Sequence, residues 1–246
     1  MKGWQIFMHS VQLVLRNLTA ALQVSGLLYL VQVAAQISAW SNPAPVSDDP
    51  IAAIGAQASF GSVLLSIAGL IASLWIAVGW HRYVLANETP RGWVPVWQGP
   101  YLLGYLGRSV LIGLLIAIAI MIAGIPVGLL AAVVPSIAAL FAFGLVGLGG
   151  YLFFRLGVML PAGAVGKPLK LKEAWEATRD DDGAVIVLAF IVMGGSALIQ
   201  LPSLIGGAGT IVDLVYQIVV GWFATVIGIS VLTTLYGHYV EGRPID

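Results

Sequence analysis

Long stretches without any charged residue dominate the pattern of polar and hydrophobic positions. Five blocks contain no Asp, Glu, Lys or Arg, namely residues 17–47, 51–80, 109–154, 184–212 and 214–237. Because a helix needs about 20 apolar residues to cross a bilayer, the block at 109–154 is long enough for two spans. The pattern therefore predicts six membrane-spanning helices, at about 18–40, 61–85, 109–130, 136–160, 184–205 and 211–239.

The first residues follow a different, amphipathic pattern. At helical spacing one face of the segment 4–18 is apolar and is formed by Trp4, Phe7, Val11, Val14 and Leu18. The opposite face is polar and is formed by Gln5, His9, Gln12 and Arg16. This pattern is typical of an interfacial helix lying in the membrane surface. The alternative is that these residues begin the first span, with polar outer turns.

Composition limits the class of protein. The chain is 59% hydrophobic and only 9% charged, whereas about a quarter of the residues in a soluble domain are charged. A water-soluble fold is thereby excluded. Six helices and their connections occupy nearly all of the 246 residues, so we expect residues 1–246 to form one integral membrane domain. We predict an all-α, polytopic membrane helical bundle, with an N-terminal amphipathic interfacial helix and a short helix near 171–180.

The basic residues indicate how this bundle is oriented. None of the eleven Lys and Arg residues lies in the connections near 41–60, 130–135 and 205–213, whose charged residues are Asp48, Asp49 and Asp213. Lys and Arg accumulate in cytoplasmic loops. We therefore predict that both termini are cytoplasmic. The net charge is zero and the basic residues are spread over several segments, so there is no case for nucleic-acid binding.

Arg155 is the ionisable residue that the pattern places furthest inside a span. An Arg at the bilayer centre costs about 2.5–3.5 kcal/mol on insertion scales, but near a helix end it can reach the headgroups. We expect Arg155 to do so, or to form a structural ion pair with Glu88 or with a residue of Asp180–Asp182. The alternative is contact with an anion or a lipid phosphate. Further candidates for such contacts on the same side are Arg82, Lys170, Lys172 and Arg179.

The first predicted span carries a stripe of polar side chains on one face, formed by Ser25, Tyr29, Gln32 and Gln36. Polar groups at this depth must face other helices or water rather than lipid tails. The stripe therefore predicts hydrogen bonds between helices. A hydrophilic path along the stripe is the alternative.

Two segments resemble a known family. The first is Arg155-Leu-Gly-Val-Met-Leu-Pro161, followed by Lys167 and the run Leu171-Lys-Glu-Ala-Trp-Glu-Ala-Thr-Arg179; the second is His81-Arg-Tyr-Val-Leu85. These segments resemble the YciC-like bacterial inner-membrane proteins, which are similar to the membrane domain fused to some glycerophosphodiester phosphodiesterases. The resemblance implies a six-span protein of the bacterial inner membrane and supplies no catalytic residues.

The sequence offers little material for catalysis or cofactor binding. It has no Cys, and its His residues, His9, His81 and His238, lie in separate segments without a second ligand at helical spacing. It also lacks a nucleophile elbow and a Gly-rich phosphate loop. We therefore expect no metal, no cofactor and no enzymatic activity. The leading prediction is an accessory or assembly protein that acts through membrane lipids or other membrane proteins. The alternative is a small transporter or channel with its path along the first span.

Overall fold

The computed structural model describes residues 1–43, 59–206 and 209–245, and its regular elements are helical throughout these ranges. They are α1 (Lys2–Arg16), α2 (Leu18–Ser41), α4 (Phe60–Ala86), α5 (Gly99–Ala131), α6 (Pro135–Gly157), α7 (Met159–Ala164), α8 (Leu171–Ala177), the 3-10 helix η1 (Arg179–Asp181), α9 (Asp182–Gly206) and α10 (Ile211–Tyr239). By length and composition, six helical stretches in the described ranges are apolar enough to cross a membrane. The predicted all-α polytopic fold is confirmed.

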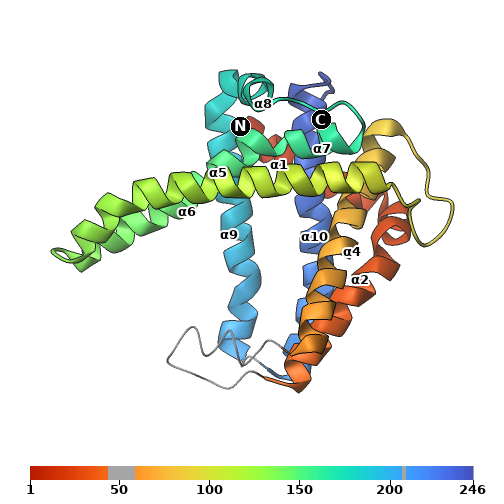
Figure 1. Ribbon diagram of the computed structural model, residues 1–246, viewed down its shortest axis with the longest axis horizontal. Coiled ribbons are helices and arrows are strands. Elements are labelled where there is room, and N and C mark those ends of the chain that lie inside the picture. Colours follow the sequence, from red (N-terminus) through yellow and green to blue (C-terminus); the bar gives the residue numbers. More distant parts are fainter. Residues whose placement is uncertain (44–58, 207–208, 246) are drawn as a thin grey trace.

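Four of these helices, α2, α4, α9 and α10, run between the same two ends of the molecule (Figure 1). One end carries both termini, the loop 87–98 and the segment from α7 to η1, and we call it the basic end. At the opposite end the indole Nε1 of Trp40 donates to the carbonyl oxygen of Gly209 at 2.8 Å, which ties α2 to the start of α10. Asp48 and Asp49 lie outside the described residues.

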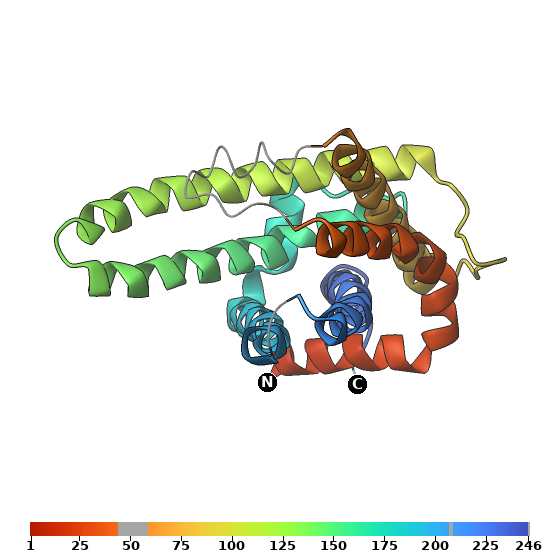
Figure 2. The ribbon, with the colours of Figure 1, turned by 90° about the horizontal axis from the view of Figure 1, so that it is seen from below.

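Helix α1 is separate from the first span, as predicted, and lies across α9 and α10 (Figure 2). The face that it buries shares only Val14 with the predicted apolar face: it consists of Gly3, Ile6, Ser10 and Val14, while Trp4 is 52% exposed. The small residues explain the difference. A Cβ at Gly3 would lie 2.4 Å from the carbonyl oxygen of Ala184, so glycine allows the backbones of α1 and α9 to touch.

The hairpin of α5 and α6 runs across the four-helix bundle and projects beyond it (Figures 1 and 2). Near its base Leu102, Tyr105 and Ile112 are buried in the core, whereas Leu129 and Leu140 near its tip are 70% and 72% exposed. The charge pattern predicted that the turn near 130–135 would lie with the far ends of the other spans. In the structure it does not, because only the base of the hairpin packs on the bundle.

The first helix of the hairpin also begins earlier than the sequence indicated. The predicted span began at about residue 109, but α5 begins at Gly99 with Pro100 in its first turn. Proline is tolerated there because the first helical N–H groups have no partner within the helix. The start of this helix was therefore predicted about ten residues too late, while residues 87–98 form no helix.

Candidate functional site

Arg155 is buried at the corner where α6 meets α8 and α9. Its side chain is 1% exposed, and it forms an ion pair with the Asp182 carboxylate at the start of α9. Its Nη1 and Nη2 also donate to the carbonyl oxygens of Thr178 at 3.0 Å and Trp175 at 3.2 Å. Its Cζ lies 4.2 Å from the centre of the Trp175 ring. Arg155 therefore joins three elements as a structural ion pair, and its guanidinium is not presented to lipid headgroups.

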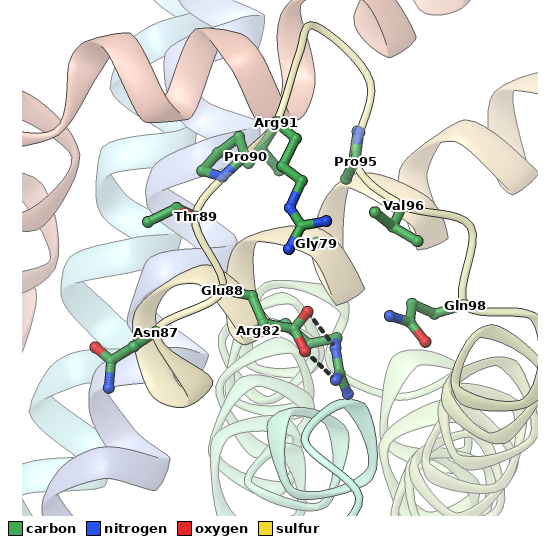
Figure 3. A pocket seen from close by; sticks show the side chains of 11 residues that line it. Gly79, Arg82, Asn87, Glu88, Thr89, Pro90, Arg91, Pro95, Val96 and Gln98 are labelled. Carbon is green, nitrogen blue, oxygen red and sulfur yellow. Dashed lines mark hydrogen bonds and ion pairs between the residues drawn. The ribbon is translucent and has the colours of Figure 1, made fainter.

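Arg82 lies at a second place, where a cavity of about 430 Å³ opens at the basic end. The cavity lies between the last turns of α4 and the loop 87–98 (Figure 3). Its polar side chains are Arg82, Asn87, Glu88, Thr89, Arg91 and Gln98. Of the predicted basic candidates, this cavity contains Arg82 alone.

Arg82 and Glu88 form a two-point contact in this cavity. The Nε of Arg82 donates to Oε2 of Glu88 at 2.8 Å, and its Nη2 bonds the other carboxylate oxygen. Nη1 donates to the carbonyl oxygen of Ala164 at 2.9 Å, and Cζ lies 4.5 Å from the Tyr101 ring centre. The hydrogen bond from Arg82 holds the pKa of the Glu88 carboxyl below its usual value, because it outweighs the opposing effect of burial. Glu88 is therefore an anion at neutral pH.

The loop that closes the cavity is held against α4 by close packing. Asn87 ends α4 in the left-handed conformation, with φ at 54°, and so turns the chain. A Cβ at Gly79 would lie 3.0 Å from the Pro95 ring, so glycine lets the loop approach the helix. The indole Nε1 of Trp75 donates to the Pro95 carbonyl at 3.1 Å, and its ring meets that of Trp97 edge to face. These contacts fix the cavity wall.

Lys170, Lys172 and Arg179 lie at a third place, on the exposed surface of α8 and η1. Lys172 is 86% exposed and its Nζ lies 3.7 Å from Oε1 of Glu176. Lys172 and Arg179 line the edge of a groove whose floor is formed by apolar residues of α5 and α6. The five basic candidates are therefore divided among one buried structural pair, one cavity and one exposed surface.

The polar stripe of the first span connects neighbouring helices. Ser25 accepts a hydrogen bond from the indole Nε1 of Trp222 in α10 at 2.8 Å, and the Tyr29 hydroxyl donates to the Ile218 carbonyl in the same helix at 3.1 Å. Gln32 donates to the Ser73 hydroxyl in α4 at 2.9 Å. Gln36, the last member, is partly buried. These bonds match the prediction of interhelical hydrogen bonding.

The sequence did not reveal one polar cluster near the basic end, which centres on His81. His81 is fully buried, with its Nδ1 2.8 Å from the Thr233 hydroxyl and its Nε2 3.4 Å from the Tyr105 hydroxyl. Because Thr233 donates to the Ile229 carbonyl at 2.9 Å, its oxygen accepts from His81, which places the proton on Nδ1. The polar pair Thr233-Thr234 in the last span was the sequence feature that could have indicated this cluster.

Neither a metal-binding group among the described residues nor a related protein identifies a functional site. Within the described ranges no group of three or more His, Asp or Glu side chains is arranged to hold a metal ion. No protein family, curated protein or solved structure matches the chain. Among the described residues, the cavity of Arg82 is lined by two guanidinium groups, those of Arg82 and Arg91, and by the carboxylate of Glu88.

Proposed function

We propose that this multi-pass membrane protein is a non-enzymatic accessory or assembly component that acts through lipid or protein contacts at its basic end. The observation that supports this most strongly is that the polar stripe of α2 forms hydrogen bonds to neighbouring helices. Ser25, Tyr29 and Gln32 each bond a neighbouring helix, and this use in contacts between helices supports the proposal. The exposed cations Lys170, Lys172 and Arg179 lie at the basic end.

The proposal includes an orientation in the membrane and a cellular location. Because Lys and Arg accumulate on the cytoplasmic side of membranes, we place the basic end in the cytoplasm. The resemblance of segments 81–85 and 155–179 to YciC-like proteins supports residence in a bacterial inner membrane. The alternative function, a small transporter or channel, would depend on the polar residues of α2.

Two sets of variants of the full chain separate these functions. The first replaces Lys170, Lys172 and Arg179 with Glu, and the second replaces Gln32 and Gln36 with Leu. We expect the first set to reduce the anionic phospholipid and membrane proteins that copurify, in a manner that depends on salt, because exposed charges are screened. We expect the second set to leave both unchanged. Arg16→Glu, another exposed basic residue of the same end, is the matched control.

Solute flux into liposomes is measured with the same proteins. The proposal fails if the wild-type protein conducts a solute and the Gln32 and Gln36 replacements abolish that flux. It also fails if the three charge reversals change copurification no more than Arg16→Glu does.

A further inference from the structure

The cavity of Arg82 contains side-chain hydrogen-bond donors that form no bond to another described residue. Arg91 carries five N–H donors, and neither Arg91 nor the Gln98 amide bonds any other described residue. Figure 3 shows the Arg91 side chain pointing toward the Arg82–Glu88 pair from above and the Gln98 side chain lying to the right of the pair. Side chains of α4 and of the loop 87–98 therefore converge on the same cavity.

The charge of this space favours an anion. Arg82 and Arg91 contribute two positive charges, and Glu88 contributes the one carboxylate among the lining residues. Glu88 occupies the Nε and Nη2 edge of Arg82, so Arg91 is left without a counterion among the described residues. An oxyanion that accepts several hydrogen bonds is the ligand that guanidinium groups bind best.

The surroundings of the cavity indicate its depth in the membrane. The same loop exposes large apolar side chains: Trp93 is 63% exposed, Val96 66% and Trp97 55%. Tryptophan concentrates at the membrane–water interface, at the level of the headgroups. The cavity therefore opens at the level where lipid phosphates lie.

We propose that this cavity binds a phosphate oxyanion, with Arg91 and Gln98 donating to its oxygens and Glu88 competing with it for Arg82. The phosphate belongs to a phospholipid headgroup or to a soluble phosphate, and the two sources share the same chemistry. This inference rests on the proposed function of the basic end, and it assigns the ligand class of one site there.

The test uses the purified full chain in a neutral detergent. Binding of phosphatidylglycerol is measured by native mass spectrometry, and binding of inorganic phosphate by the shift in melting temperature. We expect Arg91→Gln to weaken binding of one or both probes by about tenfold, because it removes a charged donor worth roughly 1.4 kcal/mol. Arg16→Gln, the same change at another exposed arginine of the basic end, should have no effect.

A second variant tests the competition. Glu88→Gln removes the carboxylate, so we expect the affinity for the same probe to rise, also by about tenfold. Loss confined to phosphatidylglycerol identifies a lipid headgroup as the source, and loss confined to inorganic phosphate identifies a soluble anion; both support the site. The inference is overturned if Arg91→Gln and Arg16→Gln bind both probes equally, or if Glu88→Gln weakens binding. Neither variant alters Lys170, Lys172 or Arg179, so the proposed function can survive that failure.

Discussion

Arg155 and Asp182 form an ion pair of unequal partners: the arginine side chain is 1% exposed and the aspartate side chain 53%. The pair joins the last turn of α6 to the first residue of α9. Since about half of the aspartate side chain remains exposed, the carboxylate keeps access to the surroundings of the protein, while the buried guanidinium depends on the protein for its partners. The stability of this corner therefore depends mainly on the arginine.

Arg155→Lys should destabilise the protein almost as much as Arg155→Leu. A lysine cannot reproduce the planar contacts to Asp182 and to the Thr178 and Trp175 carbonyl oxygens. We expect a loss of about 2–3 kcal/mol for each, measured as a lower melting temperature in detergent. Lys172→Ala removes an exposed pair and should change little. Wild-type stability of the lysine variant would contradict the proposed structural role.

The buried cluster of His81 should contribute to stability through both ring nitrogens. His81→Leu removes the bonds to Thr233 and Tyr105, and we expect a loss of about 1–2 kcal/mol. Tyr105→Phe removes one bond and should cost about 0.6 kcal/mol. His9→Leu is the control because His9 is only partly buried. The prediction fails if the two His→Leu variants melt at the same temperature.

Cysteine labelling can test both the orientation and the position of the hairpin, because the chain has no native Cys. In sealed, right-side-out cells, an impermeant reagent should label Asn42→Cys and Val212→Cys, and it should not label Thr89→Cys or Lys167→Cys. Labelling at position 89 or 167 would reverse the proposed orientation.

Ser136→Cys, beside the turn of the α5–α6 hairpin, distinguishes the structure from the charge pattern. The charge pattern predicts that this position is accessible from outside. Because the hairpin runs across the bundle and its turn lies away from the far ends of α2 and α10 (Figure 1), we expect little labelling from outside. Labelling as strong as that of Asn42→Cys would show that the hairpin crosses the membrane beside the other spans.

Gly3→Ala should weaken the docking of α1. The new Cβ would lie 2.4 Å from the Ala184 carbonyl oxygen and 3.0 Å from the Leu188 nitrogen, and backbone atoms cannot yield easily. We expect a loss of about 1–3 kcal/mol, seen as a lower melting temperature and faster proteolysis after residue 16. At Gly194 a Cβ meets no other atom within 4 Å, so Gly194→Ala should stabilise α9 slightly. Equal melting temperatures would contradict the close contact.

The helices were predictable from the sequence because they depend on local pattern. Uncharged blocks predicted α2 as Leu18–Ser41 and α10 as Ile211–Tyr239 to within about a residue at each end. Which face of a helix meets protein was not predictable, because lipid and protein core are both apolar. The buried face of α1 includes Gly3 and Ser10, which hydropathy assigns to neither environment. These small residues lie on the buried face because they allow neighbouring helix backbones to approach closely.

The same division between what local pattern predicts and what tertiary structure decides applies to the site residues. Depth inside a predicted span identified Arg155 as a residue that needs a partner, with Glu88 and Asp180–Asp182 as candidates, and Arg82 was a candidate only for contact with lipid or an anion. The choice required tertiary structure: the chain turns at η1 and begins α9 at Asp182, next to Arg155, while Glu88 follows α4 closely enough to fold back on Arg82. The cavity itself depends on the contact between Gly79 and Pro95, which no local sequence pattern predicts.

The hydrogen bond between the Ser10 and Thr234 hydroxyls joins residues 224 positions apart. Helix α1 is synthesised well before α10, so it cannot complete its docking until α10 has also left the ribosome. Contacts between such distant segments form late because a long loop must close first. Until then the face of α1 with Gly3 and Ser10 is without its partners in α9 and α10. Docking of α1 is therefore a late step of folding, and a nascent chain arrested before α10 would be recognisable by an α1 that has not docked on α10.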